Sequence, residues 1–110
     1  MSESHIGVLT RLFETIESRR GADAETSYTA KLFSRGRTAI AQKVGEEAVE
    51  VNIAALAEGP DALAAESADL IYHLMVLWAD SGITPEHVWD ELLKREGLSG
   101  IEEKRARGEL

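Results

Sequence analysis

Hydrophobic residues recur at three- and four-residue intervals along most of the chain, a spacing typical of amphipathic helices. The first run predicts a helix and consists of Ile6, Leu9, Leu12 or Phe13, and Ile16. Residues 21–26 are polar and aperiodic and predict a loop, whereas residues 28–33 predict one or two helical turns ended by Ser34-Arg35-Gly36. The sequence shows no alternation typical of strands, no repeat and no low-complexity segment. The pattern therefore indicates an all-helical protein.

A longer helix is predicted over residues 37–58, because this stretch is rich in Ala and Glu and contains no Pro. It is expected to end at Gly59-Pro60, and Asp61 is expected to cap the next helix, over residues 61–80. So short a connection makes the two helices antiparallel neighbours.

Two further helices are predicted after Gly82. Thr84 followed by Pro85 is typical of a helix start, and this helix is expected to run to Gly97. Ser99 with Glu102 resembles a capping box and predicts a short last helix.

The two central helices are apolar on more than one face, so each needs cover on several sides. The side chains concerned are Val44, Val49, Val51, Ile53 and Leu56 in the first, and Leu63, Leu70, Ile71, Leu74, Met75, Val76, Leu77 and Trp78 in the second. A domain of 110 residues offers little chain to cover them. We therefore expect one all-α domain over residues 1–110, a helical bundle built on an antiparallel hairpin and completed by homodimerisation, with a compact monomeric bundle as the alternative.

Carboxylates interrupt these apolar helices at helical spacing. Glu47 and Glu50 lie three residues apart, as do Glu66 and Asp69, so each pair projects from one helix face. Both pairs lie at similar distances from the Gly59-Pro60 turn, and antiparallel pairing brings the four carboxylates together. Such a cluster needs protons or cations to offset its repulsion, and hard oxygen ligands suit Mg²⁺, with Mn²⁺ as an alternative. The competing interpretation is that these are ordinary solvated acids in a chain with 20 acidic residues.

Basic side chains could hold a phosphorylated ligand beside such a metal. Those that precede the acids are Lys31, Arg35, Arg37 and Lys43, and those near the C-terminus are Lys94, Arg95, Lys104, Arg105 and Arg107. Lys43 lies one turn before Glu47 and is the best placed to reach the same site. The sequence contains no Walker-type glycine loop, so phosphate binding would depend on the metal and on side chains.

Three aromatic or imidazole side chains in the helices are open to two interpretations each. His73 lies one turn after Asp69 and is expected to be a satisfied core histidine or, as the alternative, a partner of the acids. Trp78 and Trp89 stand at helical spacing among aliphatic residues and are expected to pack in the core or at an interface.

Composition and charge exclude several classes of function. The net charge of -8 argues against tight nucleic-acid binding, which requires a basic surface. The absence of cysteine excludes disulfides, thiolate nucleophiles and cysteine-based zinc sites, and makes the cytoplasm the expected compartment. The N-terminus lacks the features of a signal peptide, and the apolar stretch over residues 70–79 is short for a membrane span of about 20 residues. We therefore expect neither secretion nor membrane insertion.

The acidic pattern Glu46-Glu47-x-x-Glu50, followed by Glu66-x-x-Asp69, resembles the metal-binding signature of the MazG-like all-alpha nucleotide pyrophosphohydrolases. Residues 27–33, 43–50, 66–74 and 95–100 are similar to segments of the phosphoribosyl-ATP pyrophosphatase family within that superfamily. The resemblance covers roughly residues 6–105.

The resemblance implies hydrolysis of phosphoribosyl-ATP to phosphoribosyl-AMP and pyrophosphate, the second step of histidine biosynthesis. The acids that it implies as Mg²⁺ ligands are Glu47, Glu50, Glu66 and Asp69. Glu47 and Glu50 would thereby also be catalytic, and Glu46 would orient or deprotonate the attacking water, or serve as a further ligand. The number of metal ions stays open.

The resemblance also implies which basic residues bind the substrate. Lys31 and Lys43 would contact its polyphosphate. The additional phosphate that distinguishes phosphoribosyl-ATP from simple triphosphates would be contacted by Arg95, Lys104 and Arg107. The chain has neither the length nor the cysteines of the cyclohydrolase to which many relatives are fused. A separate phosphoribosyl-AMP cyclohydrolase is therefore the expected functional partner.

Two other functions remain open from the sequence. The same fold could hydrolyse non-canonical or excess deoxynucleoside triphosphates as a housekeeping enzyme. It could also be a non-catalytic helical dimerisation module whose acids only keep it soluble. Release of pyrophosphate from different nucleotides separates the two enzymes, and metal binding separates both from the module.

Overall fold

The computed structural model describes residues 5, 7–97 and 100–109, and within these the chain forms helices and no strands, which confirms the all-α class. The elements are α2 (Val8–Ser18), α3 (Tyr28–Arg35), α4 (Arg37–Ile53), the π-helical turn η1 (Ala54–Glu58), α5 (Pro60–Ser81), α6 (Pro85–Arg95) and α7 (Gly100–Ala106).

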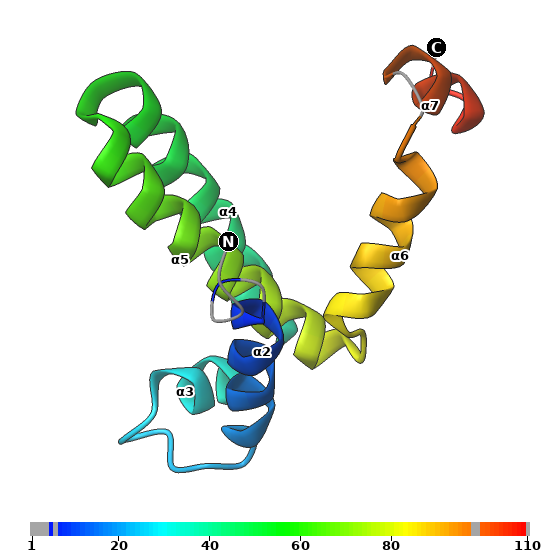
Figure 1. Ribbon diagram of the computed structural model, residues 1–110. Coiled ribbons are helices and arrows are strands. Elements are labelled where there is room, and N and C mark those ends of the chain that lie inside the picture. The colour runs from blue at the N-terminus through cyan, green and yellow to red at the C-terminus, as the bar shows by residue number, and fades with distance from the viewer. Residues whose placement is uncertain (1–4, 6, 98–99, 110) are drawn as a thin grey trace.

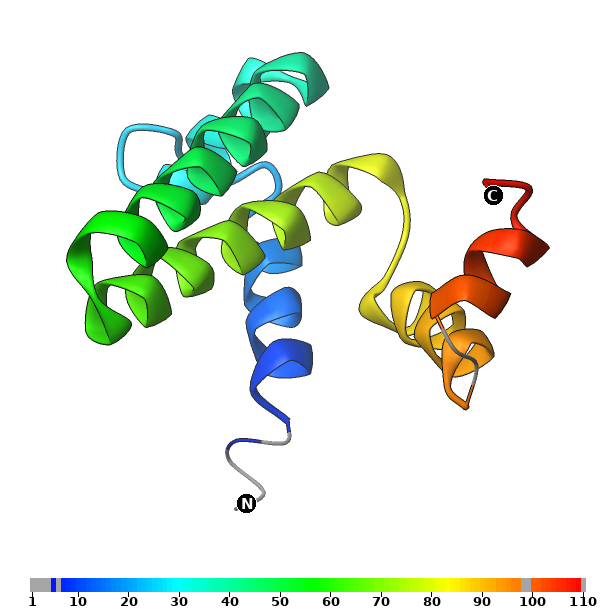
Figure 2. The ribbon, with the colours of Figure 1, turned by 90° about the horizontal axis from the view of Figure 1, so that it is seen from above.

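Helices α4 and α5 lie side by side and antiparallel, and form the longest part of the molecule (Figures 1 and 2). The turn between them is tight because Gly59 adopts a φ of 137°, which residues with a side chain rarely adopt. Pro60 follows at the first position of α5, where its missing N–H leaves no hydrogen bond unmade. The connection therefore reverses the chain directly and holds the two helices in contact.

The helix ends differ in detail from the sequence prediction. The helix predicted to reach Glu58 is α-helical only to Ile53, because the Gly59 N–H donates to the Ala54 carbonyl five residues earlier, at 3.1 Å, and widens the last turn. Asp61 lies in the first turn of α5 rather than at its cap, which is Gly59. Helix α6 ends at Arg95 rather than at Gly97. Ile6 and Ser99, predicted in the first helix and at the start of the last, lie outside the described residues.

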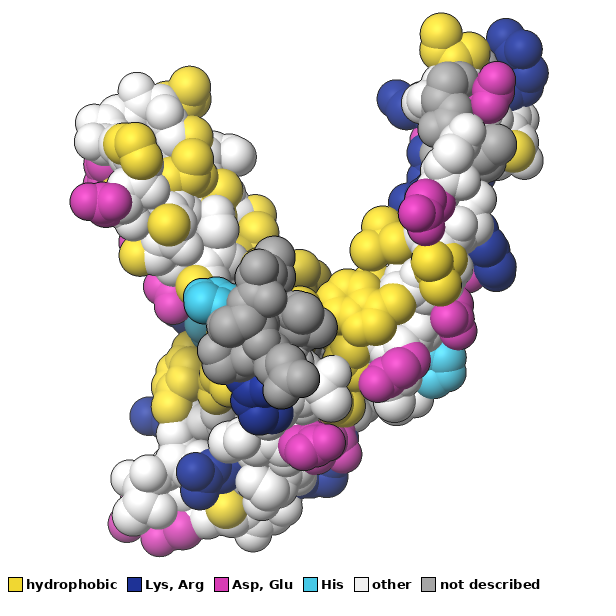
Figure 3. All heavy atoms as spheres, in the orientation of Figure 1, with side chains coloured by type: hydrophobic (Ala, Val, Ile, Leu, Met, Phe, Trp, Pro, Cys, Tyr) yellow, Lys and Arg dark blue, Asp and Glu magenta, His cyan; other side chains and the backbone are white. Residues whose placement is uncertain are grey.

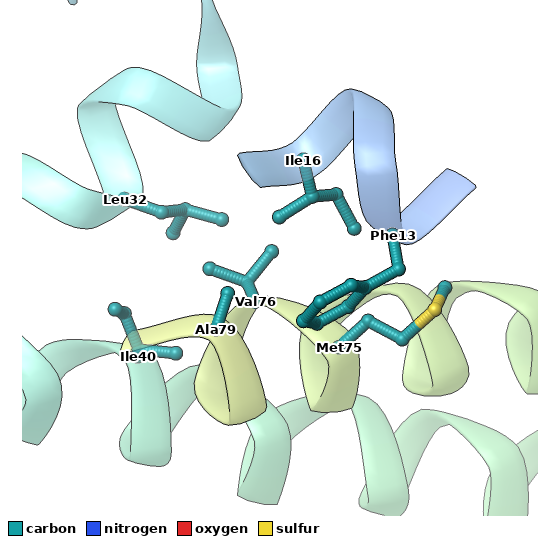
Figure 4. Close-up of a cluster of buried hydrophobic side chains, with 7 residues drawn as sticks. All are labelled: Phe13, Ile16, Leu32, Ile40, Met75, Val76 and Ala79. Atoms are coloured by element: carbon teal, nitrogen blue, oxygen red, sulfur yellow. The ribbon is translucent and has the colours of Figure 1, made fainter. Parts of the chain in front are cut away.

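A hydrophobic core joins α2 and α3 to the open end of the hairpin, where α4 begins and α5 ends. Its buried side chains converge from four helices (Figure 4) and are Phe13, Ile16, Leu32, Ile40, Met75, Val76 and Ala79. Polar contacts fasten the same end. The Arg37 guanidinium donates to the Asp80 carboxylate at 3.0 Å and to the Asp80 carbonyl at 2.9 Å, and Arg20 lies 4.7 Å above the Phe33 ring.

Helices α6 and α7 extend away from the hairpin as an arm, so that the molecule has the shape of an open V (Figures 1 and 2). At the base of the arm the Trp78 and Trp89 rings meet edge to face, 6.3 Å apart. The radius of gyration is 16.1 Å, whereas a compact domain of this length would have about 13 Å. The hairpin and the arm thus do not fold onto each other within one chain.

Helix α5 is long and apolar. An 18-residue window within this helix has a mean hydropathy of 1.2, so the helix is long and apolar enough to cross a membrane. The sequence prediction considered residues 70–79 alone, which are too short. The core helix of a soluble protein passes the same test, so one such helix is weak evidence for a membrane span. Only 22% of this window is buried within the chain. The helix therefore needs further cover.

Replacing Ile40 with Ala is expected to lower the free energy of unfolding by about 2–5 kcal/mol, because the substitution leaves a cavity in the core. Ile40 is 0% exposed, whereas Ile101 in α7 is 61% exposed, so Ile101→Ala is a matched control with an expected change within about 0.5 kcal/mol. Urea denaturation followed by circular dichroism measures both. Equal losses in the two variants would contradict this assignment of the core.

Candidate functional site

Three carboxylates from the two helices of the hairpin face one another. Glu47 in α4 and Glu66 and Asp69 in α5 each place a carboxylate oxygen so that all three oxygens lie within 4.8 Å of one another. Glu47 is 9% exposed, Glu66 is partly buried and Asp69 is exposed. The acid cluster, as we call these three residues, is therefore closed on the α4 side and open to solvent on the α5 side, and it could hold a divalent cation.

Glu50 was predicted as a fourth member but has a different place. Its side chain is exposed and does not belong to the group of oxygens within 4.8 Å. Its charge nevertheless acts on Glu66, as described below. Glu50 therefore contributes to the electrostatics of the acid cluster, and its role as a metal ligand stays a prediction.

The electrostatics of the acid cluster show the cost of holding it together. Partial removal from water, together with the charges of Asp69, Glu50 and Glu47, raises the pKa of the Glu66 carboxyl above its ordinary value. A raised pKa means that the ionised form is disfavoured in its surroundings. A cation at this point would relieve both the repulsion and the loss of solvation.

Lys43 is the cation that stands closest to the acid cluster in the described structure. Its ammonium lies 3.4 Å from Glu47 and 3.7 Å from Glu46. Partial burial acts to lower the pKa of Lys43, but the Tyr28 oxygen and the two glutamates outweigh it, and the pKa is raised. Lys43 therefore keeps its charge at neutral pH and offsets part of the charge of Glu47.

A cavity of about 250 Å³ opens on the other side of Lys43, between α3 and α4. Glu46 lies in its wall, not in the acid cluster, because adjacent helix positions point about 100° apart. The residues that line this cavity are Tyr28, Leu32, Arg35, Ala39, Gln42, Lys43 and Glu46. We call it the α3/α4 cavity. The sequence did not mark Tyr28 and Gln42 as site residues, although Ala39, Gln42, Lys43 and Glu46 share the spacing of one helix face.

His73 links the acid cluster to this cavity. The imidazole is 5% exposed, and its Nδ1 lies 2.7 Å from the Asp69 carbonyl oxygen. Because a carbonyl can only accept, Nδ1 carries the proton, and Nε2 then accepts a hydrogen bond from the Tyr28 hydroxyl at 2.8 Å. His73 is thus the satisfied core histidine that the sequence predicted, and its ring nitrogens contact the Asp69 backbone and Tyr28 rather than a carboxylate of the acid cluster.

The other predicted basic residues are divided between the hairpin and the arm. Lys31 is exposed on α3, and Arg37 pairs with Asp80, which gives Arg37 a structural role. Lys94 pairs with Glu91 on α6 at 3.0 Å. Arg95 ends α6 and Lys104 lies in α7, so both stand on the arm, away from the hairpin that carries the acids (Figure 1). The structure does not bring these two together with the acid cluster within one chain.

Comparison with known proteins identifies a family. The family described as "Phosphoribosyl-ATP pyrophosphohydrolase" matches residues 9–96. A phosphoribosyl-ATP pyrophosphatase of Azospirillum brasilense is 62% identical over 109 residues, covering 97% of this chain and 98% of the relative. That of Rhodospirillum rubrum is 62% identical over 100 residues, covering 91% and 86%, and that of Caulobacter vibrioides is 55% identical over 107 residues, covering 97% and 99%.

These matches span nearly the whole chain, including both acid-bearing helices and the α3/α4 cavity. They confirm the resemblance seen in the acidic pattern, and the relatives are named phosphoribosyl-ATP pyrophosphatases, a kind of hydrolase. The chain therefore belongs to the phosphoribosyl-ATP pyrophosphohydrolase family.

Proposed function

We propose that this protein hydrolyses phosphoribosyl-ATP to phosphoribosyl-AMP and pyrophosphate, a step of histidine biosynthesis, with Mg²⁺ as its cofactor. Family membership supports the reaction. The observation that carries the metal requirement is the convergence of Glu47, Glu66 and Asp69 oxygens within 4.8 Å. Oxygen donors of this kind fit Mg²⁺, and Mn²⁺ could take its place.

In the proposed reaction the oxygen of water bonds to the α-phosphorus, the bond from that phosphorus to the oxygen bridging it to the β-phosphate breaks, and pyrophosphate leaves with the bridging oxygen. A bound Mg²⁺ would polarise the polyphosphate and offset the charge of the leaving group. Glu47, Glu66 and Asp69 would hold the metal, with Glu50 beside them, and Lys43 would contact a phosphate. Glu46 would accept the proton of the attacking water or orient it. Most of the catalytic effect would come from this positioning.

The composition supports two further parts of the proposal. With no cysteine and a net charge of -8, the chain fits a reducing compartment such as the cytoplasm and fits a small-molecule substrate better than a nucleic acid. The product phosphoribosyl-AMP would then pass to a separate phosphoribosyl-AMP cyclohydrolase.

We further propose that two chains form a dimer that fills the open V. Large hydrophobic side chains are exposed on both walls of the V, where they gather on the hairpin and on α6 (Figure 3). Those on the hairpin are Val49, Ile53, Leu56 and Ile71, and those on α6 are Leu92 and Leu93. Exposed apolar surface of this extent is typical of interfaces.

The total accessible surface agrees with that proposal. It is 7537 Å², whereas a compact monomer of 12.0 kDa would expose about 6000 Å². A standard interface buries about 800 Å² on each partner. The accessible surface that this chain has in excess of a compact monomer is therefore large enough for one such interface. A dimer would therefore give the chain the cover that its own arm does not provide.

Replacing Glu47 with Gln is expected to lower kcat for phosphoribosyl-ATP by about 100-fold or more. Mutating a residue that only hydrogen-bonds to a metal ligand already lowers metal affinity or activity by about 10- to 100-fold, and Glu47 would be a ligand itself. Released pyrophosphate measures the rate, in parallel with dCTP, dUTP and ATP as substrates. Glu14→Gln, an exposed acid on α2, is the matched control and should keep the wild-type rate. Release mainly from the simple triphosphates would move the protein to a housekeeping function, and no release from any nucleotide would leave the non-catalytic module.

The metal site is expected to weaken as the pH falls through the raised pKa of Glu66, since Mg²⁺ needs the ionised carboxylate. In the metal-free protein, by contrast, Glu66 makes the folded state less stable as the pH rises. A carboxyl whose pKa is raised by folding favours the folded state below its ordinary pKa and loses that contribution as the pH rises. Mg²⁺ should therefore raise the Tm more at about pH 7.5 than at about pH 5.

Thermal unfolding with and without Mg²⁺ measures this effect, and Glu66→Gln provides the comparison. This variant should be more stable than wild type at neutral pH without metal, because one repelling charge is gone. It should also gain little from Mg²⁺. An equal metal-induced rise in Tm at both pH values would contradict the assignment of Glu66 to the metal site.

Replacing Leu93 with Asp is expected to convert a dimer of two 12.0 kDa chains to monomers, because a charge at the centre of an apolar interface is costly to desolvate. Sedimentation equilibrium measures the mass. Val8→Asp introduces the same charge at an exposed hydrophobic residue of α2, which belongs to neither the hairpin nor α6, and should leave the dimer intact. A monomeric wild-type protein at micromolar concentration would refute the dimer.

A further inference from the structure

The α3/α4 cavity adjoins the acid cluster without containing any of its residues. Lys43 separates the two, since its ammonium contacts Glu47 of the acid cluster at 3.4 Å and also lines the cavity. Along α4 the lining runs from Glu46, next to Glu47, back to Ala39, about 10 Å away at ~1.5 Å per residue. A group attached to a ligand in the acid cluster would therefore extend into this cavity.

The lining of the cavity carries a net positive charge in a protein whose total charge is -8. Its one carboxylate, Glu46, is paired with Lys43 at 3.7 Å. Arg35, at the end of α3, is the remaining charge, and within the described part of the chain its guanidinium has no ion pair or hydrogen bond. A guanidinium whose N–H groups have no partner in the protein is suited to bind phosphate oxygens, often with two parallel hydrogen bonds.

One residue of the cavity wall, Tyr28, is tied to a buried group of α5. The Tyr28 hydroxyl donates to His73 Nε2, and the 5%-exposed His73 is held in turn by the Asp69 carbonyl. Thr29 and Tyr72 form a further hydroxyl pair across the same contact between α3 and α5. Helix α3, which carries Arg35, is therefore held against the helix that carries Glu66 and Asp69. The cavity is preorganised relative to the acid cluster.

The size of the cavity limits what it can hold. Pockets for drug-sized ligands have volumes of about 300–1,000 Å³, and this cavity has about 250 Å³. It fits a small charged group better than a whole nucleotide.

We propose that the α3/α4 cavity binds the outer two phosphates of the substrate, the part that leaves as pyrophosphate, and that Arg35 is the residue that holds them. The proposal rests on the proposed function, because it places the reacting phosphate at the acid cluster. As the bond breaks, the bridging oxygen and its electron pair stay with the outer two phosphates, so the negative charge that develops in the reaction lies on this group. This group therefore gains from a pocket whose unpaired charge is positive.

Calorimetric titration of the full chain with inorganic pyrophosphate in the presence of Mg²⁺ tests the proposal. Arg35→Ala should weaken pyrophosphate binding about tenfold or more, the usual effect of losing a hydrogen bond between charged groups. Its affinity for Mg²⁺ alone and for AMP should match the wild type. Arg35→Lys, which keeps the charge but loses the two-pronged geometry, should fall between Arg35→Ala and the wild type.

Arg19→Ala is the matched control, because Arg19 is an exposed arginine at the end of α2 that does not line the cavity. It should change none of the three affinities, and circular dichroism should show the same helix content in every variant. Unchanged pyrophosphate binding by Arg35→Ala would overturn the proposal, as would a loss of AMP affinity in its place or a wild-type protein that does not bind pyrophosphate.

The same titrations separate this proposal from the proposed function. If Mg²⁺ binds and Arg35→Ala keeps its affinity for pyrophosphate, only the assignment of the cavity fails. If Mg²⁺ alone does not bind, the metal requirement fails, and titration with pyrophosphate in the absence of metal still measures the contribution of Arg35.

Discussion

Repulsion between carboxylates is the constraint on which the arrangement of this molecule depends. Packing α4 against α5 places oxygens of Glu47, Glu66 and Asp69 within 4.8 Å of one another, and partial removal from water together with the neighbouring negative charges raises the pKa of Glu66. Lys43 offsets Glu47, but one ammonium leaves most of the negative charge uncompensated. Such a cluster persists only where the surrounding packing forces it, and it gains stability from any cation that enters.

The packing that imposes this cost lies at the other end of the hairpin. The core around Ile40 and Val76, together with the Arg37–Asp80 ion pair, closes the end at which α4 begins and α5 ends. Gly59 closes the opposite end with a turn that only a residue of its conformational range adopts easily. The acids lie between two fastened ends and cannot separate without opening one of them. Strain at the site is thus supported by apolar packing remote from it.

The sequence predicted the helices well because periodicity and turn residues act locally. It placed Glu66 with Asp69 because residues three apart share a helix face, but by the same rule it placed Glu50 with Glu47, and Glu50 is not among the three acids whose oxygens converge. It could not tell which of Glu46, Glu47 and Glu50 faces α5, since that depends on the rotation of α4 about its axis. It also could not show that Arg37 forms an ion pair with Asp80, or that Tyr28 forms a hydrogen bond with His73, because these partners are 43 and 45 residues apart in sequence. Long-range contacts of this kind are fixed by packing, not by local pattern.

The direction of the arm connects the electrostatics of the site to the assembly. Arg95 and Lys104 stand on α6 and α7, which leave the hairpin at the base of the V, so one chain separates these basic residues from its own acids (Figures 1 and 2). Two chains with a net charge of -8 each repel one another. A dimer that places the basic side chains of α6 and α7 of one chain along the acidic hairpin of the other would set opposite charges against each other at these positions and cover the apolar walls of both. In that arrangement Arg95 and Lys104 would reach a site only in the assembly.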